Sequence, residues 1–195
     1  MSLTIGIIGL PQSGKTSLFN ALTKAGAPIS GYASSTVQAN FAVVPVPDAR
    51  LQPLADIFNP KKVTPTTVEF VDVAGMGQQA DSEKREGLSP EFLGHIRNAD
   101  ALAIVLRTFK NDNVPAPNNS IDPSRDLDGL FAELSLTDLN SVEKRIERTT
   151  KAAKSGDKKY VKELETLKAI RDGLNELNLA SDIDLSSQDR EVLKE

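Results

Sequence analysis

The amino-acid sequence predicts an α/β fold with a mostly parallel sheet and crossover helices, joined to an antiparallel helical hairpin. In residues 1–125, short apolar runs rich in β-branched residues alternate with stretches long enough to be helices. Such alternation is typical of a sheet whose strands are connected by helices. Residues 126–180 contain no Pro and are rich in Leu, Glu, Lys and Arg, a composition that favours helix.

The expected strands are short and apolar. Leu3–Ile8 is closed by Gly9 and has the β-branched composition of a strand buried on both faces. Three more apolar runs are expected to be strands, at 41–46, 68–72 and 101–106. Helices are expected at 15–24, 48–58 and 90–98, the last with Ser89 as its N-cap and Pro90 at its first position.

The predicted hairpin consists of two amphipathic helices. Apolar residues recur at steps of three and four from Leu139 to Ala153 and again from Tyr160 to Leu177, with Gly156 between the two stretches. The charged faces of such helices are usually solvated. The hairpin is therefore expected to be a structural arm or a surface for a partner.

Charge and composition exclude several classes of function. With 23 basic and 27 acidic side chains the net charge is -4, so overall charge gives no reason to expect binding to a polyanion. The chain has no Cys, which excludes thiol nucleophiles, disulfides and Cys-based zinc sites. No apolar run approaches the roughly 20 residues of a membrane-spanning helix, and the strand-like first residues lead us to expect no secretory leader. We expect a cytoplasmic protein that binds neither membranes nor DNA directly.

A phosphate-binding loop is predicted immediately after the first strand. Residues 9–16 read GLPQSGKT and match the pattern G-x-x-x-x-G-K-[ST], directly before a predicted helix. Lys15 is expected to reach the outer phosphates, and the Thr16 hydroxyl to ligate Mg²⁺. The alternative is an ordinary turn with a solvated lysine. The expected nucleotide-binding residues of this loop are Pro11, Gln12, Ser13, Gly14, Lys15, Thr16 and Ser17.

A second motif follows a later strand. Asp72 begins the sequence D-x-A-G, in which a carboxylate at a strand end holds a Mg²⁺-bound water and the amide of Gly75 senses a γ-phosphate. Thr36, in the loop between the two motifs, is expected to cap the metal and the γ-phosphate. The predicted metal site therefore consists of Thr16, Thr36 and, through water, Asp72. Together the motifs predict a P-loop NTPase.

Longer stretches of the chain carry a family resemblance. They lie at 9–11, 14–15, 18–23, 43–48, 50–51 and 65–75, and continue at 92–93, 95–97, 100–101, 109, 111–113, 133–134 and 138–139. The sequence resembles the YchF / Obg-like ATPase family of P-loop NTPases in the translation-factor class. The resemblance implies a nucleotide-binding domain interrupted by a helical hairpin and followed by a TGS-like domain.

The resemblance also implies a division of this chain into parts. Residues 1–125 are expected to be the N-terminal part of the P-loop domain, and 126–180 the inserted hairpin. Residues 181–195 are expected to begin the return to the P-loop domain, before the N-x-x-E-type base-recognition motif of the family and its TGS-like domain. The preference for ATP or GTP therefore has no readable signal in these residues.

The implied function is slow Mg²⁺-dependent hydrolysis of ATP or GTP by a ribosome-associated protein. Met76 stands where Ras-like enzymes have the glutamine that orients water, and Ala116 stands where this family often has a histidine. No catalytic residue is therefore assigned, and intrinsic activity is expected to be weak. Gln12 replaces the asparagine that helps potassium-activated relatives bind K⁺, so the resemblance leaves K⁺ dependence open.

Two side-chain types near the motifs leave alternatives open. His95 either approaches the nucleotide or packs against the protein, and packing is favoured. Arg97 and Arg107 either stabilise charge in the transition state or form salt bridges at a sheet edge or helix face, and salt bridges are favoured.

Two other functions are compatible with the motifs. The first is a hydrolysis-deficient, nucleotide-gated module that docks the ribosome or another partner through the hairpin. The second is a structural fragment that binds nucleotide poorly.

Overall fold

The computed structural model describes residues 3–29, 39–73, 88, 90–116, 120–154, 156–176 and 178–193. The chain forms two compact units, Met1–Asp126 and Leu127–Glu195. The first contains a four-stranded sheet, and the second consists of helices and their connections. None of the helices in the described ranges is long and apolar enough to span a membrane.

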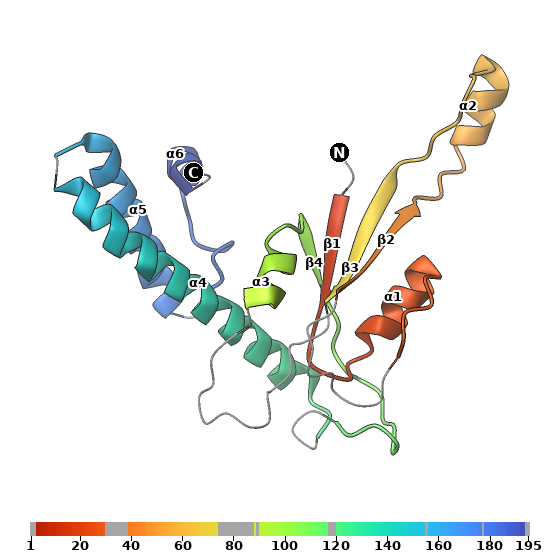
Figure 1. Ribbon diagram of the computed structural model, residues 1–195, viewed down its shortest axis with the longest axis horizontal. Helices are drawn as coiled ribbons and strands as arrows, with labels where there is room; N and C mark the ends of the chain where they lie inside the picture. Colours follow the sequence, from red (N-terminus) through yellow and green to blue (C-terminus); the bar gives the residue numbers. More distant parts are fainter. Residues whose placement is uncertain are drawn as a thin grey trace. The chain divides into compact units, whose positions relative to one another are not determined.

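The sheet is mostly parallel, as the sequence predicts. Its strands are β1 (Leu3–Ile8), β2 (Ala39–Pro45), β3 (Thr67–Val73) and β4 (Ala101–Ile104), in the spatial order β2-β3-β1-β4 (Figure 1). β1 pairs in parallel with both β3 and β4, whereas β2 runs antiparallel to β3. Strands β1, β3 and β4 therefore end at the same edge of the sheet.

Helices α1 (Lys15–Thr23) and α3 (Pro90–Ile96) lie on opposite sides of the sheet (Figure 1). α1 contacts β1, β2 and β3, and α3 contacts β3. The core of this unit is formed by apolar side chains of the two central strands and of the helices beside them. Its most deeply buried members are Ile7, Ile8, Phe19, Val71, Val73 and Phe92. Burial is complete only over the last three residues of each central strand, at 6–8 in β1 and 71–73 in β3, next to the edge where these strands end.

Several element ends differ from the predicted ones. β4 ends at Ile104 instead of 106, although the Val105 amide still donates to the carbonyl of Ile8 at 2.8 Å. α2 (Leu51–Phe58) begins three residues after the predicted start at 48. The reason is a turn in which the Arg50 amide donates to the Asp48 carboxylate at 2.9 Å. The predicted N-cap Ser89 lies outside the described residues.

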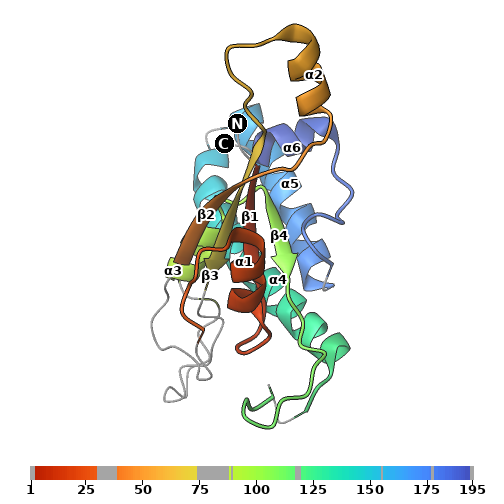
Figure 2. The ribbon, with the colours of Figure 1, turned by 90° about the vertical axis from the view of Figure 1, so that its right-hand side faces the viewer.

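α2 stands away from the sheet at the end of the extended β2 and β3 strands (Figure 2). None of its residues is buried. Ile57 is 70% exposed and Phe58 is 75% exposed, so the apolar side of this helix faces solvent.

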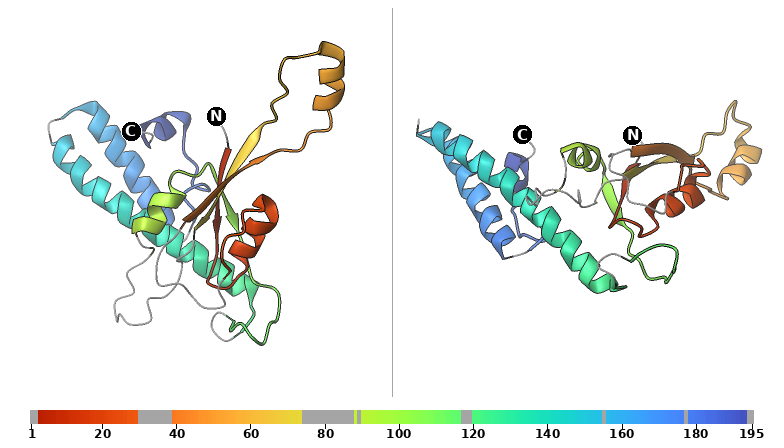
Figure 3. Two further views of the ribbon diagram at one scale, coloured as in Figure 1. Left: turned by 45° about the vertical axis from the view of Figure 1, so that its right-hand side comes forward. Right: turned by 60° about the horizontal axis from the view of Figure 1, so that its bottom comes forward.

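The predicted antiparallel hairpin is present in the second unit (Figure 3). Its helices are α4 (Pro123–Ala153) and α5 (Lys158–Asn175), and α6 (Ser187–Leu193) follows. Gly156 has a positive φ of 79° in the connecting turn, and the side chain of Asp157 caps α5 by accepting from the Lys159 amide at 2.9 Å. α4 begins before the predicted 126 because Pro123 occupies its first turn, where a missing N–H costs nothing.

A polar clamp joins the two long helices. Glu163 on α5 is 8% exposed and accepts from Arg145 at 2.8 Å and from Thr149 at 3.3 Å, both on α4. A carboxylate this buried needs its partners, because an unpaired buried charge is strongly destabilising.

A similar contact attaches α6 to α5. Asp189 accepts hydrogen bonds from the Ser186 hydroxyl at 2.6 Å and the Thr166 hydroxyl at 2.9 Å, and pairs with Lys162 at 3.0 Å. These contacts, led by the Ser186 hydrogen bond, hold the pKa of Asp189 well below its usual value.

We expect Glu163→Gln to lower the free energy of unfolding by about 1–2 kcal/mol, because the buried carboxylate that Arg145 and Thr149 bind loses its charge. The measurement is urea unfolding followed by circular dichroism. Glu165→Gln is the matched control, since Glu165 is an exposed residue of the same helix and its replacement should have little effect. Equal losses for the two variants would contradict a special role for the clamp.

Candidate functional site

Residues 9–14 form a tight loop between β1 and α1. Gly9 and Gly14 have positive φ values of 152° and 102°, and a Cβ on Gly9 would collide with the carbonyl oxygen of Val105. Gln12 also has a positive φ, of 61°, in the left-handed region. The two glycines of the motif are therefore required by backbone conformation, and at Gly9 also by the close approach of another segment.

The loop leads directly into the amino end of α1. Gly14 is the N-cap residue and the Leu18 amide donates to its carbonyl at 2.9 Å, as the first turn of the helix closes. The amides of the first helical turn, at residues 15–17, have no acceptor inside the helix. Together with the helix dipole, amides in this position attract phosphate groups.

Lys15 is buried under the loop. Its side-chain ammonium donates to the carbonyl oxygens of Gly9 at 2.9 Å and Leu10 at 2.8 Å, and the residue is only 8% exposed. Burial lowers the pKa of Lys15 from 10.5 to about 8, while the negative charge of Asp72 acts in the opposite direction. The loop therefore holds a cation ready for an anionic ligand.

Asp72 lies near the end of β3, where the parallel register pairs it with Ile7 of β1. Its Oδ2 atom accepts from the Thr16 hydroxyl at 2.8 Å and from the side-chain amide of Asn40 at 3.4 Å. Asp72 is completely buried, and its Oδ1 atom has no hydrogen-bond partner among the described residues. The buried hydroxyl of Ser13 also has none in that part of the chain.

This arrangement fits a magnesium ion. A hydroxyl and a carboxylate supply the hard oxygen donors that Mg²⁺ prefers, and Mg²⁺ usually keeps several waters and substrate phosphates as its other ligands. An unpartnered buried carboxylate oxygen is costly, so a cation or its water would satisfy Asp72. The described residues contain no cluster of three or more His, Cys, Asp or Glu that could hold a metal ion without such a ligand.

The structure describes only some of the predicted site residues. Those of the loop are all described: Pro11, Gln12, Ser13, Gly14, Lys15, Thr16 and Ser17. Thr36, Gly75 and Met76 lie outside the described residues. Sequence reasoning did not single out Asn40, which reaches Asp72 only through the antiparallel register of β2 and β3. No local signal could have identified it.

Of the three side chains with open alternatives, His95 and Arg107 occupy different environments, and the prediction for Arg97 stays untested. The His95 ring lies edge-on to Phe41, with ring centroids 5.8 Å apart. The prediction that Arg107 forms a salt bridge is wrong for the part of the chain that the structure describes. Arg107 is 2% exposed, and its guanidinium donates to backbone carbonyls of the segment that follows β4.

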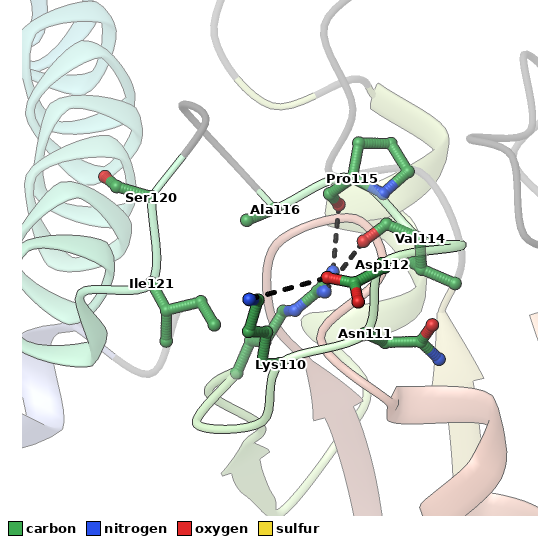
Figure 4. Close-up of a pocket in the computed structure, with 9 residues that line it drawn as sticks. Lys110, Asn111, Asp112, Val114, Pro115, Ala116, Ser120 and Ile121 are labelled. Carbon is green, nitrogen blue, oxygen red and sulfur yellow. Dashed lines mark hydrogen bonds and ion pairs between the residues drawn. The ribbon is translucent and has the colours of Figure 1, made fainter.

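A cavity of about 300 Å³ lies beside this segment (Figure 4). Lys110, Asp112 and Val114 line one side, and Ser120 and Ile121, which precede α4, line the other. Ala116 also faces the cavity, at the position where the family resemblance implies a histidine. Of the described phosphate-loop residues, none lines it.

Known proteins that resemble this chain belong to the class that the phosphate loop indicates. The family model described as 50S ribosome-binding GTPase matches residues 4–133. The ribosome-binding ATPase YchF of Bacillus subtilis is 42% identical over 195 residues, which are 100% of this chain and 53% of that protein. The protein of the same name from Haemophilus ducreyi is 44% identical over 194 residues, again 100% of this chain and 53% of the relative.

A solved structure is also similar. The YchF GTPase of Schizosaccharomyces pombe matches with a TM-score of 0.72 and 28% identity, covering 98% of this chain and 52% of that one. This chain therefore spans about half the length of the relatives it matches.

The burial of Lys15 makes the stability of the fold depend on pH. Between about pH 8 and pH 10.5 the unfolded chain holds the Lys15 proton more firmly than the folded protein, so stability rises with pH across this window. Relative to Lys15→Met, the wild type should gain about 2 kcal/mol between pH 7 and pH 10. Urea unfolding at both pH values measures this gain.

The exposed Lys61 provides the control for that measurement. Lys61→Met makes the same substitution at an exposed position, so it should not reproduce the pH-dependent difference expected for Lys15→Met. If the difference in unfolding free energy between the wild type and Lys15→Met does not change with pH, the burial of the Lys15 ammonium would be contradicted.

Proposed function

Because the chain belongs to the family of 50S ribosome-binding GTPases, and to its YchF branch, we propose that it binds ATP or GTP with Mg²⁺ and hydrolyses it slowly. The observation that carries the proposal is the contact between Thr16 of the phosphate loop and the buried carboxylate of Asp72. It joins the two predicted motifs, which lie 56 residues apart in the sequence, in one site.

Each residue of the site has a proposed role. The amides at the start of α1 and the Lys15 ammonium bind the β- and γ-phosphates. Thr16 ligates the metal directly, and Asp72 holds it through water. Thr36 and Gly75 complete the contacts to the metal and the γ-phosphate. When bound, Mg²⁺ neutralises charge on the triphosphate.

The proposed hydrolysis is weak. A methionine cannot position an attacking water by hydrogen bonding, so Met76 does not replace the glutamine of Ras-like enzymes. Ala116 has no side-chain donor or acceptor either. The relatives are nevertheless named ATPases, which favours slow turnover over the hydrolysis-deficient alternative.

The proposed organisation has three parts. Residues 1–125 form the nucleotide-binding part, 126–180 the inserted hairpin, and 181–195 the return towards the nucleotide-binding domain. The two YchF relatives from bacteria are named ribosome-binding, so we propose the ribosome as a partner, with the hairpin as a docking element. A cytoplasmic location follows from this partner.

We expect Lys15→Ala to weaken the binding of Mg–ATP and Mg–GTP about a hundredfold or more, because the phosphates lose their buried cation. Titration calorimetry measures the affinity, and single-turnover phosphate release with and without ribosomes measures the chemistry. Lys61→Ala, which changes an exposed lysine outside the site, is the control. Unchanged affinity of the Lys15 variant for both nucleotides would refute the proposal.

We expect Asp72→Asn to remove most of the effect of Mg²⁺ on nucleotide affinity, because the amide no longer attracts the cation's water. The measurement is the ratio of Kd values with Mg²⁺ and with a chelator. Glu69→Gln changes an acidic residue on the same strand and should leave that ratio unchanged. A normal ratio in the Asp72 variant would exclude its role at the metal.

A further inference from the structure

Arg107 carries a buried charge for which the described residues supply no carboxylate partner. The residue is 2% exposed, and every hydrogen bond shown for it in the described part of the chain goes to a backbone carbonyl. Burial of a guanidinium is costly unless its donors are satisfied, so this contact has to hold firmly when the protein is folded.

The guanidinium fixes the path of the chain that follows β4. Its Nε donates to the Phe109 carbonyl at 3.2 Å, Nη1 to Pro115 at 2.9 Å and Nη2 to Val114 at 2.8 Å. The bonds to Val114 and Pro115 are drawn in Figure 4. Because the donors of a guanidinium form a rigid planar fork, the carbonyls of Phe109, Val114 and Pro115 are held in one arrangement around it.

The same side chain also holds an aromatic ring. The guanidinium carbon of Arg107 lies 4.8 Å from the centre of the Phe109 ring, a cation–π distance. The Phe109 ring is partly exposed and lies near the phosphate loop, since a Cβ built on Gly14 would be 3.8 Å from its Cε1 atom.

The segment after β4 therefore lies beside both glycines of the phosphate loop. The carbonyl of Val105 lies against Gly9, and Phe109 lies beside Gly14. Arg107 stands between these two contacts in the sequence and fixes the second of them. A loop that must present several amides to phosphate gains affinity when its conformation is set before the ligand arrives.

We propose that Arg107 is a positioning residue for the phosphate loop: it holds Phe109 against Gly14 and raises nucleotide affinity without contacting the nucleotide. This inference rests on the proposed function, because it concerns the same binding site. It differs from a role in the transition state, since its effect is on binding and is present before any nucleotide arrives.

The test is a substitution at residue 107 that removes the planar guanidinium and keeps a positive charge. Arg107→Lys should raise the Kd for Mg–ATP and Mg–GTP about tenfold, as expected when charge-assisted hydrogen bonds are lost. Without nucleotide, amide hydrogen exchange should become faster at residues 109–116 and also at 12–17. Arg50→Lys is the matched control, because Arg50 is exposed and pairs with Asp48 outside the site, so both measurements should stay unchanged.

A merely structural role of Arg107 gives a different result. It would lower the thermal midpoint while the folded protein keeps its Kd and the exchange rates at residues 12–17, and this outcome would overturn the inference. If the wild type binds neither nucleotide, the proposed function itself fails.

A second variant keeps the inference testable if Arg107→Lys does not fold. Phe109→Leu removes the ring and leaves the carbonyl that Arg107 binds. It should also accelerate exchange at residues 12–17, and in the double variant the two effects on Kd should not add, because both act through one contact. Unchanged exchange in Phe109→Leu, or full additivity, would overturn the inference.

Discussion

The parallel pairing of β1 with β3 and β4 is the constraint on which the site depends. It brings the carboxyl ends of three strands to one edge of the sheet, and a different functional segment follows or ends each strand. The phosphate loop follows β1, Asp72 lies near the end of β3, and Arg107 comes shortly after β4. Ligands bind at this edge in open α/β sheets because the loops there converge.

Three charged residues in the segments that end or follow these strands are buried. Lys15, Asp72 and Arg107 are each less than a tenth exposed. The protein satisfies both cations mainly with backbone carbonyls, and Asp72 with a hydroxyl and an amide. Charges that are already desolvated interact strongly with a ligand and need little rearrangement when it binds. The site is therefore organised at some expense to the stability of the fold.

The sequence predicts correctly those features of the fold that short-range sequence patterns determine. The β1 strand, the glycines of the phosphate loop and the helical hairpin have short-range patterns, and the structure contains all three. Thr16 and Asp72 were identified from their motifs, and the structure brings them into contact, while their metal-binding roles stay predictions. Asn40 and the carbonyl partners of Arg107 depend on strand register and loop path, which no short pattern encodes.

Helix α2 is expected to unfold locally more easily than the sheet. An isolated helix of 8 residues is too short to be stable in water by itself, and this one buries none of its side chains. Its unwinding would expose little new apolar surface, so the local free energy of opening is small compared with that of the sheet. Fraying at this end of the β2–β3 extension can therefore proceed while the opposite edge, with the phosphate loop, keeps its native contacts.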